Sequence, residues 1–104
     1  MALDRWGIPS FTINTDTTLL TVPAGQESAI WSILIASSAA ELANFIFKHT
    51  DTDGVTVIFQ WTLPKAVGES PTAIQSPVAM KAGDKIIVQC DQPEGSVLAS
   101  GEVK

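Results

Sequence analysis

Apolar and polar residues alternate in several short runs of this 104-residue chain. The clearest two runs, residues 42–49 and 55–62, flank the turn sequence Asp-Thr-Asp-Gly at positions 51–54. Alternating runs on either side of a DG turn predict a β-hairpin. One face of this hairpin is expected to supply much of the core, because each aromatic ring buries about 150–250 Å². That face holds Phe45, Phe47, Phe59 and Trp61.

The most apolar run, residues 28–36, has large apolar side chains at both odd and even positions. Strict alternation would place Trp31, Ile33 and Ile35 on one face. The opposite face would then hold Ile30, Leu34 and Ala36. A strand that is apolar on both faces is predicted to be central in its sheet, covered by the opposite sheet on one side and by a neighbouring segment or subunit on the other.

Further strands are predicted at residues 17–22 and in a closing β-hairpin at residues 81–104. In that hairpin, residues 85–91 and 96–103 are strands, and turns precede and separate them. The pattern as a whole predicts an all-β fold, an antiparallel β-sandwich of about seven to eight strands that is jelly-roll-like or Ig-like. Residues 11–104 are expected to form a single domain.

Two segments do not fit this pattern. Residues 1–10 contain Gly7 and Pro9 and are interpreted as an N-terminal arm. Their apolar residues and the one that follows could anchor the arm on a neighbouring subunit, because aromatic side chains dominate interface energetics. These candidate anchors are Trp6, Ile8 and Phe11. In the alternative interpretation, Trp6 folds back and caps its own sandwich.

The other segment, residues 63–79, is interpreted as a long loop with a short edge strand near residues 73–76. It holds three prolines, which disfavour a helix or a central strand. Long loops on rigid β scaffolds often carry partner contacts, so the prolines are candidate contact residues. They are Pro64, Pro71 and Pro77. Alternatively, the loop is a surface crossover between two sheets.

Composition and net charge indicate which classes of binding partner to expect. Hydrophobic residues make up 45% and charged residues 16% of the chain, and an apolar surplus in a small domain suggests that another subunit covers part of it. The net charge is −5, and the six Lys and Arg residues are scattered, so a nucleic-acid partner is not expected. Neither a membrane-spanning run nor a secretion signal is present in the sequence.

Candidate chemistry is sparse. Cys90 is the only cysteine and His49 the only histidine, which excludes an internal disulfide and a two-histidine metal site. A Cys90, His49 and Asp91 arrangement is conceivable, but no nucleophile elbow accompanies it. The turn at 51–54 resembles part of a calcium loop without its glycine and glutamate spacing. We expect no enzyme activity, catalytic residue, metal or cofactor, although eleven acids leave some carboxylate pair open.

Short turn motifs carry a family resemblance over residues 18–103. Thr21-Val22-Pro23-Ala24-Gly25 precedes the apolar run, and Ala82-Gly83-Asp84 opens the closing hairpin, which ends in Ser100-Gly101-Glu102. These motifs resemble small β-sandwich structural proteins in the virions of tailed bacteriophages. The chain departs from that group in the segment with Trp6 and in the loop at 63–79.

The resemblance implies a capsid decoration or cement protein that stabilises the head by binding across capsomers. Such a protein would form a homo-oligomer, a trimer in that group, and would bind the major capsid protein or another virion protein. A chain that starts with its own Met1 and lacks fibre-like repeats is most similar to this type. Its expected location is the virion, assembled in the host cytoplasm. Alternatives are a neck, tail or fibre component, or a carbohydrate-binding or adhesion module.

Overall fold

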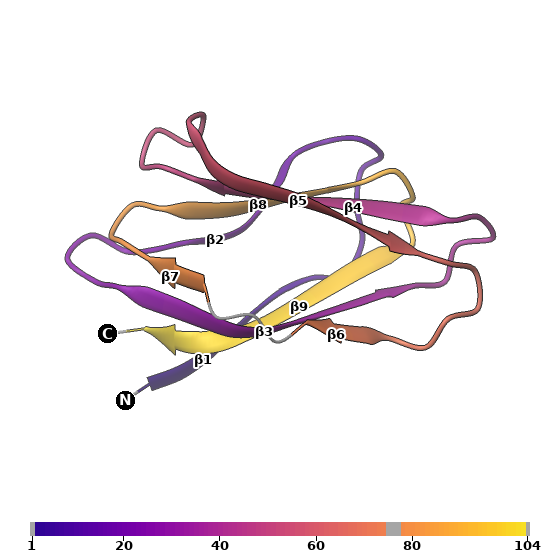
Figure 1. Ribbon diagram of the computed structural model, residues 1–104, viewed down its shortest axis with the longest axis horizontal. Coiled ribbons are helices and arrows are strands. Elements are labelled where there is room, and N and C mark those ends of the chain that lie inside the picture. The colour runs from indigo at the N-terminus through magenta and orange to yellow at the C-terminus, as the bar shows by residue number, and fades with distance from the viewer. Residues whose placement is uncertain (1, 75–77, 104) are drawn as a thin grey trace.

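A computed structural model describes residues 2–74 and 78–103, which form two antiparallel β-sheets without a helix (Figure 1). The predicted all-β sandwich is therefore confirmed. Among the described residues, no helix is long and apolar enough to cross a membrane. The strands are β1 (Ala2–Ile8), β2 (Thr17–Thr21), β3 (Ser28–Ser37), β4 (Ala43–Thr50), β5 (Val57–Lys65), β6 (Thr72–Ile74), β7 (Val78–Met80), β8 (Lys85–Cys90) and β9 (Gly95–Val103).

The strand order is that of a jelly roll. The first sheet has the order β1-β9-β3-β6, with β7 also paired to β3, and the second sheet has the order β2-β8-β4-β5. Because β6 lies beside Ile33–Ile35 and β7 beside Ser28–Ile30, these two short strands together occupy one strand position. The first position then pairs with the last, the second with the next to last, and so on inward to the β4–β5 hairpin. This first-with-last order of strand pairing distinguishes the jelly roll from the Ig-like alternative.

The β4–β5 hairpin forms as predicted around its DG turn. Gly54 adopts a positive φ of 71°, a conformation that glycine reaches without a steric cost. Asp53 holds the turn by accepting hydrogen bonds from the backbone N–H groups of Val55 and Thr56, both at 2.8 Å. The pairs Phe47–Trp61 and His49–Phe59 lie opposite each other in the ladder.

The closing segment does not form the predicted hairpin. Both strands are present, but β8 lies in the second sheet and β9 in the first, so the turn at residues 91–94 crosses between the sheets. Alternation shows which face of a strand is buried and not which neighbour it pairs with, and this ambiguity explains the error. Gly95 makes the crossing possible, since an added Cβ would lie 2.8 Å from Cys90 Sγ and 2.9 Å from Phe45 Cζ.

A β-bulge alters the predicted faces of β3. The register with β9 shifts between Ile30 and Ser32, which leaves Trp31 as the extra residue on β3. A bulge inserts one residue and thereby reverses the alternation beyond it. As a result Ile30, Ile33 and Ile35 all lie in the core, whereas strict alternation had placed Ile30 on the opposite face.

Most of the segment interpreted as an N-terminal arm forms the strand β1. β1 pairs with β9 over seven residue pairs, from Ala2–Val103 to Ile8–Val97. Gly7 is tolerated within the ladder, where it lies opposite Leu98, and Pro9 follows the last pair. Proline and glycine at the end of an edge strand do not interrupt its pairing. β6 overlaps the first part of the short edge strand predicted near residues 73–76. Residues 75 and 76 lie outside the described residues.

Candidate functional site

An apolar groove of about 330 Å³ crosses the outer side of the first sheet at its β1–β9–β3 junction. Leu34 of β3 and Leu98 of β9 face each other in the ladder, with 36% and 42% of their surfaces exposed. Gly7 lies on the other side of Leu98, and a Cβ there would be 3.7 Å from Leu98 Cδ1. The absence of a side chain at Gly7 therefore leaves the leucine pair open to solvent.

The groove brings together one candidate contact residue from each of the two segments singled out in the sequence. Ile8, at the end of β1, and Pro71, in the β5–β6 loop, both line it. Sixty-three positions separate these residues, so no local sequence signal could have paired them. One candidate from each of the two predicted contact surfaces thus borders the same groove.

The three candidate anchors of the N-terminal segment face their own domain. Ile8 and Phe11 are buried in the core, at 5% and 6% exposure. The Phe11 and Phe45 rings pack in a T-shaped arrangement with centroids 6.0 Å apart. Trp6 is half-buried against the same core and borders a small cleft of about 110 Å³ beside Val22. This placement agrees with the alternative in which Trp6 caps its own sandwich.

The three candidate prolines are separated. Pro64 is an exposed residue of β5 opposite Asn44, so β5 runs through a position that the sequence assigned to a loop. A proline is tolerated there because β5 is the last strand of its sheet. Pro71 lines the groove. Pro77 lies outside the described residues.

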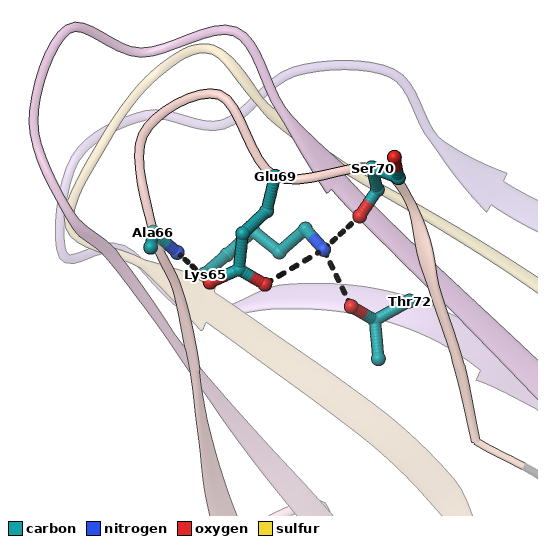
Figure 2. Close-up of polar contacts among 5 residues, drawn as sticks. All are labelled: Lys65, Ala66, Glu69, Ser70 and Thr72. Atoms are coloured by element: carbon teal, nitrogen blue, oxygen red, sulfur yellow. Dashed lines mark hydrogen bonds and ion pairs between the residues drawn. The ribbon is translucent and has the colours of Figure 1, made fainter.

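A buried lysine fixes the loop that carries Pro71 (Figure 2). Lys65, at the end of β5, is 1% exposed, and its Nζ donates to the Ser70 carbonyl, to Thr72 Oγ1 and, at 3.4 Å, to Glu69 Oε2. A buried ammonium requires such partners because water no longer solvates it. Glu69 also accepts a hydrogen bond from the Ala66 backbone N–H at 3.0 Å. Sequence reasoning missed this cluster, because a spacing of four residues indicates an ion pair on a helix and residues 63–79 were assigned to a loop.

The conceivable Cys90, His49 and Asp91 arrangement does not assemble. Cys90 lies opposite Phe45 and His49 opposite Ile86, at different ends of the β4–β8 ladder, and four residues of strand span about 13 Å. Burial raises the pKa of the Cys90 thiol above its ordinary value, which disfavours the reactive thiolate. Asp91 accepts hydrogen bonds from the backbone N–H and the side-chain amide of Asn44, at 2.8 and 3.0 Å. These contacts tie the sheet-crossing turn to β4.

His49 instead pairs with the AGD turn. Its Nε2 lies 2.9 Å from Asp84 Oδ2, and both residues are buried. The same Asp84 oxygen accepts a hydrogen bond from the Lys81 backbone N–H at 3.1 Å. The pair joins the end of β4 to the turn before β8, so it is a structural contact across 35 positions of the chain.

The DTDG turn shows no metal-ligating geometry. Asp53 Oδ2 accepts a hydrogen bond from Thr56 Oγ1, and its Oδ1 binds two backbone N–H groups. These bonds, led by the Thr56 hydroxyl, lower the pKa of Asp53 from 3.8 to about 2. Among the described residues, no group of three or more His, Cys, Asp and Glu side chains is arranged to hold a metal ion.

A second exposed apolar surface lies along β5, where the sequence predicted core. Phe59 is 61% exposed, although it shares a face with Trp61, whose ring stacks on buried Phe47 at 5.1 Å. Val57 and Ile58 are also exposed, at 44% and 54%. The alternation predicted the face of Phe59 correctly. It could not predict that the opposite sheet would leave this end of the face uncovered.

No protein-family model matches the chain, and no curated protein matches its sequence.

Proposed function

We propose that this chain is a non-enzymatic structural protein of a tailed-bacteriophage virion, most specifically a decoration protein that stabilises the capsid by binding the major capsid protein. The proposal combines the turn-motif resemblance with the jelly-roll arrangement of the strands. Jelly rolls occur in viral capsid proteins and also in lectins and cupins. Because one fold hosts many functions, the support has to come from particular surfaces and motifs.

The two turn motifs of the resemblance form one structural unit, which is the first support. The Val22 backbone N–H donates to the Asp84 carbonyl at 2.9 Å, and the Gly83 N–H donates to the Val22 carbonyl at 2.9 Å. Gly83 has a positive φ of 85°, and a Cβ there would lie 2.5 Å from Thr52 Cγ2. The TVPAG and AGD turns are thus joined by backbone hydrogen bonds, and Gly83 is a position that a larger residue could not occupy without displacing Thr52.

The observation that carries the proposal is the groove at Ile8 and Pro71. It is apolar, its floor is the exposed pair Leu34 and Leu98, and the Lys65 cluster holds its Pro71 side in place. Contiguous exposed apolar surface on a small protein marks an interaction site. A cement protein needs such a surface, since it stabilises a shell by burying area on the capsomers.

Immunogold labelling tests the proposal. An antibody against this chain would be applied to purified phage particles produced by the organism that encodes it, with chain-free particles from a deletion phage as the control. We expect regular labelling of the head. Labelling confined to the neck, tail or fibres would support the alternative virion position, and unlabelled virions would contradict the proposal.

A carbohydrate-binding module is the second candidate, and the exposed aromatic pair is the observation that favours it. Phe59 and Trp61 lie 5.5 Å apart at the free side of β5, and sugar rings stack on exposed aromatic faces. However, one face of Trp61 is already stacked on Phe47 with an interplanar angle of 5°. Glycan-array binding that is lost in Phe59→Ala would favour this candidate over the decoration protein.

A further inference from the structure

The outer strands of the two sheets differ in how they resist pairing with another chain. An exposed edge strand can template pairing, and proteins prevent this with charges, bulges or very short edge strands. β1 carries exposed Asp4 and Arg5, β2 has a register shift between Thr18 and Leu20, and β6 and β7 have three residues each. β5 is the remaining outer strand among the described residues.

The central part of β5 has none of these protective features. Residues 59–63 read Phe-Gln-Trp-Thr-Leu, with no charge, proline or glycine. The register with β4 shifts at Ile58, and Pro64 follows the segment. The bulge and the proline each lie three positions from Trp61, so the segment that can pair is centred on that residue.

We propose that two copies of this chain associate by antiparallel pairing of residues 59–63 with the same segment of a second copy, about a two-fold axis at Trp61. The contact is isologous, because the same surface serves on both sides. Pairing joins the two second sheets into one continuous sheet and satisfies the outward backbone groups of both edges.

Side chains match in this register. On the aromatic face, Phe59 of one copy lies opposite Leu63 of the other, and the two Trp61 residues lie opposite each other. On the other face, Gln60 lies opposite Thr62. Apolar positions therefore meet apolar positions and polar positions meet polar ones, which is the pattern that stabilises cross-strand pairs.

Other registers are less favourable. A shift by one residue would place aromatic side chains opposite positions from the other face, which the pleat does not allow. A shift by two residues would bring Pro64 or the bulge at Ile58 inside the ladder. The proposed register is the one that keeps both features at its ends.

Charge also permits self-association at this edge. The nearest cation on the polar face is Lys48, opposite Gln60 on β4, and it lies 3.4 Å from Asp16. In the pair of copies the two Lys48 residues would be separated by at least three strand spacings, about 14 Å. That distance exceeds the screening length at 0.1 M salt. A two-fold pair differs from the trimer expected from the family resemblance, and it does not depend on a virion role.

Sedimentation equilibrium of the full chain over a concentration series tests the pairing. Because five residue pairs make a small interface, we expect a monomer–dimer equilibrium with a dissociation constant on the order of 10 μM. The double variant Gln60→Glu/Thr62→Glu places two pairs of like charges opposite each other across the axis and should weaken the dimer about tenfold or more. The matched control, Thr18→Glu/Thr21→Glu on exposed positions of β2, should dimerise like the wild type.

A charge-swap mixture separates lost pairing from lost folding. Gln60→Lys/Thr62→Lys alone should also be monomeric, whereas mixing it with the Glu variant should restore a 1:1 heterodimer. A wild-type protein that remains monomeric at about 200 μM, which is roughly twenty times the expected dissociation constant, would overturn the inference. So would a dimer or trimer that the Glu variant leaves unchanged, or a mixture that stays monomeric. None of these results bears on head labelling, so failure here is distinguishable from failure of the proposed function.

Discussion

β1 and β5 are outer strands of opposite sheets, yet they differ in how far their apolar side chains are buried. β1 and the residues after it, which the sequence marks as a partner-binding arm, bury Ile8 and Phe11 almost completely. β5, which the sequence marks as core, leaves Phe59 61% exposed. β1, which was expected to bind a neighbour, packs on its own domain. β5, which was expected to pack in the core, is open to a neighbour.

The cause lies in what faces each strand. In the two strand orders, β1 and β2 take one end of the sandwich, whereas β5 shares the other end with β6 and β7. β2 contributes Leu19 and Leu20 to the core. On that side, the described strands of the first sheet beside β3 are β6 and β7, with three residues each. Cover from the opposite sheet, rather than the apolar content of a strand, decides which edge remains available to a partner.

Deleting residues 2–8 should have the largest effect on this comparison. The deletion removes the β1–β9 ladder and the buried Ile8, and the burial of one such side chain alone contributes about 2–3 kcal/mol. We expect the melting temperature to fall by more than about 10 °C in differential scanning calorimetry. A truncated protein that melts like the full chain would show that β1 is a dispensable arm after all.

Two matched phenylalanine variants should give the next largest effect. Phe11→Ala leaves a cavity beside Phe45 and should cost about 3–5 kcal/mol of unfolding free energy. Phe59→Ala should cost less than about 1 kcal/mol, because most of that ring is already in solvent. Urea denaturation is measured at a protein concentration below about 1 μM, roughly a tenth of the expected dimer dissociation constant, so that folded monomers are compared. Equal losses for the two variants would contradict the proposed contrast.

Low pH should produce the smallest effect, at the turn that leads into β5. The folded pKa of Asp53, about 2, lies below its ordinary value of 3.8. The ionised Asp53 carboxylate therefore contributes its full stabilisation above about pH 4, and this stabilisation is lost as the pH falls through about 2. Asp53→Asn should lower the urea midpoint slightly at pH 7, and its difference from the wild type should shrink toward zero near pH 2. A difference that grows on acidification would show the opposite linkage.

The sequence was informative wherever a local signal sufficed. The DG turn with flanking alternation predicted the β4–β5 hairpin, and the segments assigned as strands largely became strands. Residue Gly95 shows where local reasoning stops, since it permits a crossing between sheets and the pattern had indicated a hairpin. Trp31 shows the same limit, because the bulge that alters the faces of β3 arises from pairing with β9, far along the chain.

The candidate site was predictable only in part. Composition indicated an exposed apolar surplus, and the surplus is present on β5 and in the groove. Its location depends on long-range packing: Ile8 and Pro71 line one groove across the fold, and Phe59 is 61% exposed although it shares a face with Trp61. Proline and glycine were weighted too strongly as signs of an arm, since Gly7 pairs within the β1 ladder and Pro9 lies beyond it.

Hydrogen–deuterium exchange at increasing protein concentration tests the central contrast most directly. Peptides that cover residues 59–63 and residues 2–8 would be followed by mass spectrometry in the same samples. If β5 is the open edge, amide exchange in residues 59–63 slows as the concentration rises from about 1 to 100 μM, bracketing the expected dimer constant. Exchange in β1 stays the same over that range. Concentration-dependent protection of β1, or unchanged exchange in β5, would contradict the account.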